Sequence, residues 1–307
     1  MRRRYATADV FTDRMFGGNP VAVALDAAGL SAGQMQAVAA EFNYSETTFV
    51  LPPRDPSHTA RVRIFTPGRE VPFAGHPNVG TAFVLAREML ARGEAVPDRL
   101  VFEEAAGLVP VDLLREGGAV TGAELTAPEP LSRRAEVAPS RAAACLSLAA
   151  EEVRVDAHPP QVASVGLPFL VVELASRDAL RRARPDRAAY DELFPLDGAM
   201  AVYAYTRDVG TEAPEAGTDL QARMFTPRMT EDPATGSATA AATALLAGLR
   251  GGAELRLRVG QGVDMGRPSL LLARVREEGG TVTAHVGGRC VGVMEGSFAL
   301  DGDGVTT

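Results

Sequence analysis

The sequence predicts an α+β protein of two related lobes, each a sheet curled around one helix. The first observation is a repeat, in which Arg63 to Pro67 (RIFTP) returns as Arg223 to Pro227 (RMFTP). The second is that each copy continues in step through a proline to a glycine, Gly75 or Gly236, and then to an apolar stretch. The third is that many short strand-like runs accompany few helical ones, and the alanine-rich helical stretch can be buried on every side. A site between related halves is a natural place for chemistry.

The repeat extends beyond this motif. Residues 18–23 (GNPVAV) correspond weakly to residues 166–171 (GLPFLV), so the repeated unit is a whole domain. A proline-rich, charged stretch over 127–141 is typical of a crossing between lobes. We therefore expect lobes over residues 1–127 and 128–289, each within the usual size of a domain.

Each half shows the expected alternation of strands with one or two helices. In the first half we expect strands over 6–11, 21–25, 47–51, 59–65, 100–103, 108–114 and 119–125, with helices after the capping box of Ser31 and Gln34 and over 78–91. In the second we expect strands over 153–157, 169–174, 201–205, 220–225, 254–259, 269–275, 281–286 and 290–298, with one helix within 176–193 and another over 238–249. The acidic stretch 207–219, which holds Gly and Pro, predicts a mobile surface loop.

Composition excludes several classes of function. The net charge of -8, from 31 basic and 39 acidic residues, provides no basic field for nucleic acid. The longest weakly apolar run, 238–249, is too short for a membrane span, and the arginine-rich start lacks the apolar run of a secretion signal, so we expect a cytoplasmic protein. Every basic side chain is arginine, which excludes a lysine Schiff base and the P-loop lysine.

No cofactor or metal is indicated. Cys145 and Cys290 lie far apart and outside the repeated motifs, as buried small apolar residues would. The four histidines have no close ligand spacing. Gly260-Gln261-Gly262 follows a strand, but the next element is again a strand and not the helix that a dinucleotide requires.

The two repeated segments each place a glycine and a polar residue at the start of a helix. These are Gly75 with His76, and Gly236 with Ser237. A helix start presents unpaired N–H groups and partial positive charge, which suits a carboxylate or a developing enolate. For a single copy we would favour glycines that merely permit tight turns, but two copies favour a site.

Among acidic residues, Glu46 stands between a helix end and an apolar strand, where partial burial favours acid/base work, although a lone glutamate at a strand start is usually solvated. Asp232 precedes a proline and is equally typical of a turn, and Glu231 beside it is an equal candidate. A hydrolase triad of Ser237, His76 and Asp232 is a weak alternative, because Thr235 and Thr239 occupy the places where a nucleophile elbow needs glycine.

Several segments together resemble one known family. They are Asp9 to Thr12, Gly18 to Pro20, Ser45 to Thr47, Phe73 to Pro77, Glu231 to Ala238 and Gln261 to Pro268. On these residues the chain resembles the PhzF-like phenazine-biosynthesis isomerases, within the diaminopimelate-epimerase superfamily. The resemblance implies two pseudo-symmetric lobes, each with a barrel-like sheet around a central helix, and a cofactor-free site in the cleft. It also implies that a final strand near 290–300 returns to the first lobe, and that the protein is a homodimer.

The resemblance also assigns roles. The superfamily's racemases use two cysteines at the paired helix starts, and this chain has His76 and Ser237 there instead, so a two-thiol racemase is not expected. A glutamate matching Glu46 is the acid/base of the PhzF-like branch, and residues matching His76, Asp232 and Ser237 orient substrate or assist the proton. Expected substrate-binding residues are Asn19, Gly75, Thr235 and Gly236.

The expected function is that of a cofactor-independent isomerase that moves a proton between carbons of a small carboxylate. The family's best-known substrate is a dihydro-hydroxyanthranilate, and the sequence itself leaves the substrate open. The alternative is a non-catalytic small-molecule binding protein on the same fold. No nucleic acid, membrane or metal is expected as a partner.

Overall fold

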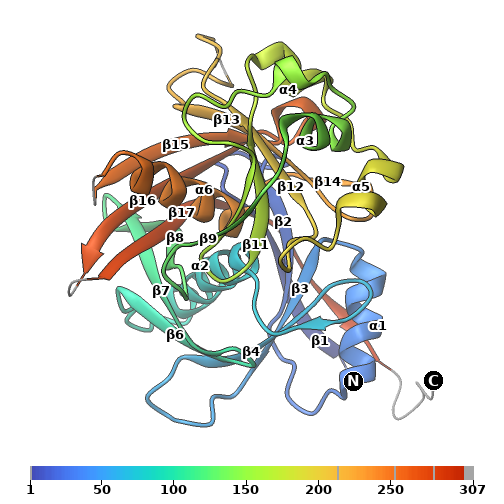
Figure 1. The fold of residues 1–307 in the computed structure, drawn as a ribbon. Helices are drawn as coiled ribbons and strands as arrows, with labels where there is room; N and C mark the ends of the chain where they lie inside the picture. The colour runs from blue at the N-terminus through green and yellow to red at the C-terminus, as the bar shows by residue number, and fades with distance from the viewer. Residues whose placement is uncertain (1, 213, 252–253, 279–280, 301–307) are drawn as a thin grey trace. The chain divides into compact units, whose positions relative to one another are not determined.

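The computed structural model describes residues 2–212, 214–251, 254–278 and 281–300, and the chain divides into two compact units. Unit 1 comprises residues 1–125 and 287–307, and unit 2 comprises residues 126–286. The chain therefore passes from one unit to the other twice, after Leu125 and again after Val286 within the long strand β17 (Thr281–Ala299). Figure 1 shows the order of the elements along the chain.

The strands of unit 1 form a closed sheet. They are β1 (Arg2–Val10), β2 (Asn19–Ala24), β3 (Glu46–Leu51), β4 (Ala60–Phe65), β5 (Glu70–Val71), β6 (Arg99–Glu104), β7 (Gly107–Glu116), β8 (Ala119–Thr126) and the later part of β17. The pairings run β1–β2–β3–β4–β6–β7–β8–β17 and return from β17 to β1, while β5 adds a short pairing to β4. Strands β2 and β3, and likewise β4 and β6, run parallel, whereas the other neighbours with a printed register run antiparallel.

Two helices cover different faces of this sheet. Helix α2 (Gly75–Ala91) is buried along its first three turns and contacts β1, β2, β3 and β7, as a helix enclosed by its own sheet must. Its Gly80 lies so close to β1 and β2 that an added Cβ would stand 2.4 Å from Val21 and 2.8 Å from Val10. Helix α1 (Ala32–Phe42) starts at the predicted capping box and packs Met35 and its apolar neighbours on the outer side of β3 and β4.

Unit 2 repeats this plan. Its strands are β9 (Ser132–Glu136), β10 (Gln161–Ser164), β11 (Pro168–Glu173), β12 (Val202–Thr206), β13 (Leu220–Phe225), β14 (Glu231–Asp232), β15 (Leu255–Gln261), β16 (Ser269–Glu278) and the first part of β17. They pair in the order β9–β10–β11–β12–β13–β15–β16, and β14 adds to β13 as β5 adds to β4. Helix α6 (Gly236–Leu249) is buried on nearly all sides and contacts β10, β11, β15 and β16.

Three short helices cover the other face of the unit 2 sheet. They are α3 (Pro139–Cys145), α4 (Arg177–Arg182) and α5 (Arg187–Leu193). Their apolar side chains share one cluster with the sheet, including Leu146, Leu180, Tyr190 and Phe225. The α+β class, with few helices and a sheet wound around each central helix, is confirmed.

The repeated motif carries an ion pair in both halves. Arg63 pairs with Glu70 between β4 and β5 at 2.6 Å, and Arg223 pairs with Glu231 between β13 and β14 at 2.7 Å. The first pair is partly exposed and the second is buried, with exposed side-chain fractions of 27% and 37% against 6% and 11%. Arg223 also donates through Nη1 to carbonyls at the end of α4, so it joins α4 to the sheet.

Some predicted elements are wrong. The expected strand over 153–157 does not form. A 3-10 turn (Ala150–Glu152) precedes this run, its Val153 makes one isolated bridge with Leu174, and Val155 is 48% exposed. The single helix expected within 176–193 is two, α4 and α5, because Pro185 interrupts it by lacking an N–H. The crossing over 127–141 contains strand β9, and the two last strands are one continuous β17.

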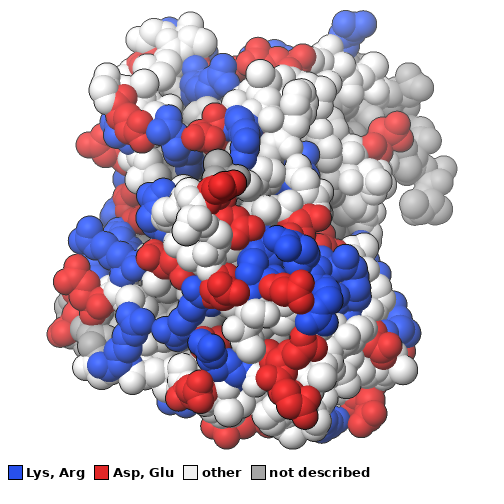
Figure 2. All heavy atoms as spheres, turned by 90° about the horizontal axis from the view of Figure 1, so that it is seen from above, with Lys and Arg blue, Asp and Glu red and all other residues white. Residues whose placement is uncertain are grey.

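Charges of both signs are interspersed on the face drawn in Figure 2. Exposed pairs such as Arg99 with Asp112, 2.6 Å apart, and Arg289 with Glu116, 2.8 Å apart, contribute little to stability individually. Among the described residues, none of the helices has the length and apolar character that a membrane crossing requires.

Candidate active site

Unit 1 brings Glu46 and His76 together. Parallel pairing of β2 and β3 places Val21 beside Glu46, so Asn19 and Pro20 at the start of β2 lie near the start of β3. His76 stands in the first turn of α2, with its Nε2 3.5 Å from Glu46 Oε2. The His76 side chain is nearly buried, whereas 20% of the Glu46 side chain remains exposed. The glutamate is therefore the solvent-facing member of the pair.

The histidine of this pair is neutral. Burial lowers the pKa of His76 to about 3, against a smaller opposing effect of its hydrogen bond to the Pro20 carbonyl. Nε2 has no hydrogen-bond partner in the described structure, so it is Nδ1 that donates to Pro20. The contact with Glu46 is therefore not an ion pair: Nε2 turns an unprotonated lone pair towards the carboxyl group. Such a lone pair can accept a hydrogen bond from Glu46 only when Glu46 is protonated.

Helix α2 offers its first turn without a side-chain cap. Its N-cap is Ala74, which has no side-chain hydrogen-bonding group, whereas Ser31, Ser176 and Asp186 cap α1, α4 and α5. The amides that begin with Gly75 are therefore not taken up by a capping side chain. Partial positive charge at this helix start favours an anion.

Unit 2 places Asp232, Thr235 and Ser237 on one short loop before α6. Asp232 ends β14, and its Oδ2 accepts a hydrogen bond from Thr235 Oγ1. Thr235 is the N-cap of α6 but makes no capping hydrogen bond, because its hydroxyl is committed to Asp232. Gly236 and Ser237 form the first turn, with Gly236 buried and Ser237 partly exposed. The loop therefore combines a carboxylate, a hydroxyl and an uncapped helix start.

Two of the alternatives considered from the sequence do not fit. Glu231 is held by the buried Arg223 and has the role of an ion-pair partner. His76 Nδ1 donates to a backbone carbonyl, where a hydrolase triad would need a carboxylate. Both cysteines are buried, and burial raises the pKa of Cys145 to about 11 and of Cys290 to about 12. Neither is a ready thiolate.

Sequence reasoning missed the role of Gln261, the last residue of β15. Its Oε1 accepts from the Thr235 amide at 3.1 Å, and its Nε2 donates to the Asp232 carbonyl at 2.9 Å and to Thr235 Oγ1 at 3.1 Å. The next residue, Gly262, has φ +73°, and an added Cβ would stand 2.6 Å from the Pro233 carbonyl. The signal available in the sequence was the glutamine and glycine that open the Gln261 to Pro268 segment.

Each unit therefore starts its central helix without a side-chain cap, beside a glutamate and a neutral histidine in unit 1 and beside an aspartate in unit 2. The chain belongs to the phenazine biosynthesis-like (PhzC-PhzF) family, whose model matches residues 8–296. It is an isomerase of this family.

Individual relatives agree over nearly the whole chain. The protein is 39% identical over 310 residues to an uncharacterized isomerase of Mesorhizobium japonicum, covering 97% of this chain and 99% of the relative. It is 37% identical over 307 residues to the trans-2,3-dihydro-3-hydroxyanthranilate isomerase of Pseudomonas aeruginosa, with the same shares covered. A solved PhzF-family structure from Bacillus anthracis matches with a TM-score of 0.83 at 23% identity, covering 98% of this chain and 100% of the other, which shows the shared fold.

Proposed function

We propose that this isomerase moves a proton between two carbons of a small carboxylate without a cofactor, on a substrate of the dihydro-hydroxyanthranilate type or a related one. The observation that carries the proposal is the partly exposed Glu46 carboxyl opposite an unprotonated imidazole nitrogen at an uncapped helix start. One relative is named for an isomerisation of trans-2,3-dihydro-3-hydroxyanthranilate, which suggests the substrate class.

In the proposed reaction Glu46 is both base and acid. Its carboxylate takes a proton from a carbon next to an unsaturated or carboxylate group, and the electron pair of the broken C–H bond moves into the conjugated system. The protonated Glu46 then donates a hydrogen bond to the lone pair on His76 Nε2, which fixes its orientation. It finally returns the proton to a second carbon on the same face. A double bond shifts, and there is no net oxidation.

The helix starts are proposed to stabilise the anion formed between these two proton transfers. The amides of Gly75 and His76, and those of Gly236 and Ser237, lie in first helical turns that no side chain caps, and preorganised donors are the usual form of such stabilisation. We assign Asn19 and Thr235 to substrate binding.

Asp232 and Ser237 are assigned a supporting role in the same reaction. Asp232 accepts a hydrogen bond from the Thr235 hydroxyl and so orients the loop. Ser237, the second residue of α6, is partly exposed. We expect Asp232→Asn and Ser237→Ala to reduce kcat less than Glu46→Gln does, because they do not remove the group that carries the proton.

The test is solvent-isotope exchange. The protein is incubated in deuterated water with dihydro-hydroxyanthranilate and a panel of cyclic and amino carboxylates, and carbon-bound deuterium is read by NMR. We expect exchange or isomerisation for the wild type and a loss of about 10²- to 10⁴-fold for Glu46→Gln, the usual contribution of a general base. Glu41→Gln changes an exposed glutamate of α1 in the same unit and should leave the rate unchanged.

Two outcomes contradict the proposal. Undiminished exchange in Glu46→Gln means that another group is the base. Measurable binding of panel compounds with no exchange for any of them favours a non-catalytic binding protein.

Two expectations about the protein's context belong to the same proposal: a homodimer, and action in the cytoplasm. The chain has a mass of 32.2 kDa, so sedimentation equilibrium at micromolar concentration should give twice this value. A mass of one chain would refute the dimer, and recovery of the tagged protein outside the cytoplasmic fraction of its host would refute the location.

A further inference from the structure

Glu104 and Gln261 occupy the same position in the two halves. Each is the last residue of a strand, β6 or β15, that runs parallel to the strand carrying the repeated motif, β4 or β13. The register partners that fix this correspondence are Arg61 with Glu103 in unit 1 and Gln221 with Gly260 in unit 2. Arg61 and Gln221 each lie two residues before the repeated arginine, so the next residue on the parallel strand is Glu104 in one half and Gln261 in the other.

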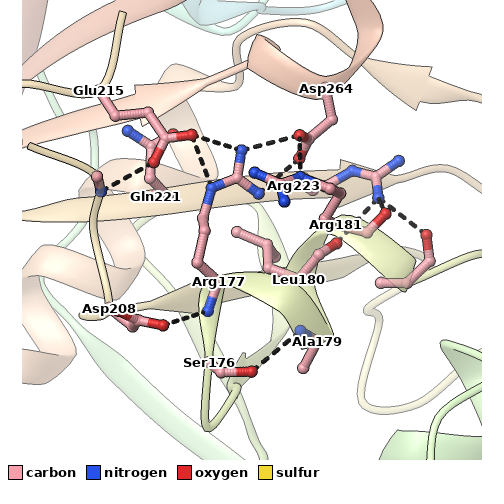
Figure 3. Close-up of polar contacts among 12 residues, drawn as sticks. Ser176, Arg177, Ala179, Leu180, Arg181, Asp208, Glu215, Gln221, Arg223 and Asp264 are labelled. Carbon is pink, nitrogen blue, oxygen red and sulfur yellow. Dashed lines mark hydrogen bonds and ion pairs between the residues drawn. The ribbon is translucent and has the colours of Figure 1, made fainter. Parts of the chain in front are cut away.

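In unit 2 this position holds the loop before the central helix. Gln261 bonds to Asp232 and Thr235 through three hydrogen bonds of 2.9 to 3.1 Å. Asp264, three residues further along, anchors this segment. It accepts hydrogen bonds of 2.8 Å from both terminal nitrogens of the buried Arg177, and Figure 3 shows the pair. The position of Gln261 therefore requires a neutral side chain that can both donate and accept hydrogen bonds.

In unit 1 Glu104 reaches the equivalent loop. The hairpin turn that follows Glu104 donates from the Ala106 amide to the Pro72 carbonyl, at the start of the loop that leads into α2. The side chain neighbour of Glu104 is Asn78, whose Nδ2 in turn donates to the Ala74 carbonyl at 3.1 Å. Glu104 and Asn78 therefore connect β6 to the residue directly before Gly75.

The contact between Glu104 and Asn78 lacks a hydrogen-bond donor for three buried oxygen atoms. Asn78 Oδ1 and both carboxyl oxygens of Glu104 are buried and have no hydrogen-bond partner of regular geometry in the described structure. With Glu104 ionised, these three atoms are all acceptors, and buried acceptors without donors are costly. A proton on Glu104 supplies a donor and makes the side chain neutral and able to donate and accept, as the amide of Gln261 is.

We propose that Glu104, in its protonated form, is a positioning residue that holds the start of α2 through Asn78, as Gln261 holds the start of α6. Glu104 touches neither substrate nor the reacting atoms. It acts through the loop that positions Gly75 and His76. The expected effect of Glu104 on activity rests on the proposed function, whereas its expected effect on the loop does not.

The surroundings agree with a protonated carboxyl. Burial raises the pKa of Glu104 to about 8, against a smaller lowering by Asn78. Two charged residues are close in the sheet, Glu103 on β6 and its register partner Arg61 on β4. Because side chains alternate along a strand, both lie on the face of the sheet opposite to the Glu104 side chain. On α2, the titratable group nearest in sequence to Asn78 is His76, which is neutral, and Arg87 and Glu88 lie more than two turns further along the helix. No charged side chain contributes to the shift.

The sign of the pH effect follows from this raised pKa. Between the ordinary value of 4.5 and about 8 the folded protein holds a proton that the unfolded chain has lost. The stability contributed by this site is therefore fully present below pH 4.5 and is lost as the pH rises towards 8. Within that window the folding constant of the wild type, relative to that of Glu104→Gln, should fall by up to tenfold per pH unit.

The experiment compares the wild type with Glu104→Gln, Glu104→Leu and the control Glu103→Gln. Carboxyl-¹³C glutamate labelling should show one resonance that titrates near pH 8 and is missing only from the Glu104 variants. Hydrogen exchange of the amides of residues 74–76, corrected for intrinsic rates, should rise above pH 8 in the wild type and not in Glu104→Gln. Isomerase activity should fall above pH 8 in the wild type, stay level in Glu104→Gln, and be lower at every pH in Glu104→Leu through kcat.

Each result decides for or against the proposal. A Glu104 resonance that titrates near pH 4.5, or an alkaline change in amide exchange that persists in Glu104→Gln, overturns it. If no substrate undergoes exchange in any form of the protein, the proposed function fails, while the titration and the amide exchange still test this inference. Glu103 sits in a pocket of N–H donors from Asp55 and Arg54 with His58, so its variant should keep the alkaline change.

Discussion

The repeated arginine provides a stability test with an internal control, Arg223→Met against Arg63→Met. Arg223 is buried, pairs with Glu231 through two hydrogen bonds of 2.7 and 2.9 Å, and donates to carbonyls at the end of α4. Methionine keeps most of the volume but leaves the Glu231 carboxylate buried without its partner. Breaking a buried pair in this way costs about 3–5 kcal/mol.

The control pair, Arg63 with Glu70, has the same chemistry but is more exposed to solvent. Arg63 and Glu70 are joined by two hydrogen bonds of 2.6 Å, but both side chains are more than a quarter exposed. Solvent-screened pairs of this kind contribute about 0.2–1 kcal/mol. Each ion pair has two hydrogen bonds, so the burial of Arg223 and its further bonds to α4 should decide the difference between the two variants.

Thermal and urea unfolding measure this difference. At about 2–4 °C per kcal/mol for a unit of this size, Arg223→Met should lower Tm by about 6–20 °C, and Arg63→Met by less than about 4 °C. The double variant Arg223→Met with Glu231→Leu should recover much of the loss, because no buried charge then remains unpaired. Equal effects of the two arginine variants would refute the reasoning.

Three further predictions concern packing, thiols and acid. Gly80→Ala should destabilise the protein by about 1–3 kcal/mol, because the added Cβ would overlap β1 and β2. Gly248→Ala lies on an exposed turn of α6, where the nearest atom to the added Cβ is 3.7 Å away, and should stabilise the protein by about 0.5–1 kcal/mol. Urea unfolding measures both changes. Cys145 and Cys290 should resist a thiol reagent at pH 8 until the protein unfolds, and rapid labelling of the native state would contradict their burial. Because the pKa of His76 is lowered to about 3, stability should be lost as the pH falls below 6.5 towards 3, and His76→Gln should flatten that part of the pH curve.

The sequence predicted most of the fold because its strongest signals are local or repeated. The two copies of the motif located β4 with α2 and β13 with α6, and the capping box at Ser31 located α1. Propensity failed where tertiary context decides. The run over 153–157 is apolar enough for a strand but has no covering sheet, and β9 is charged yet pairs with β10.

Of the site, sequence alone identified types of residue but not their protonation. Glu46 and His76 are 30 positions apart in the sequence. Only the structure shows that they lie 3.5 Å from each other and that burial keeps the imidazole neutral. The matching positions of Glu104 and Gln261 could not be read from the sequence, because a carboxyl and an amide do not align as a repeat. Strand register revealed the correspondence.

Label transfer within one turnover tests the central claim most directly. A substrate deuterated at the carbon that loses its proton is mixed in ordinary water with excess enzyme, and the product of the first turnover is analysed by mass spectrometry and NMR. If Glu46 alone carries the proton, part of the deuterium should appear at the second carbon of the product, and Glu46→Gln should form no product on this timescale. First-turnover product without any deuterium, formed at an undiminished rate by Glu46→Gln, would contradict the account.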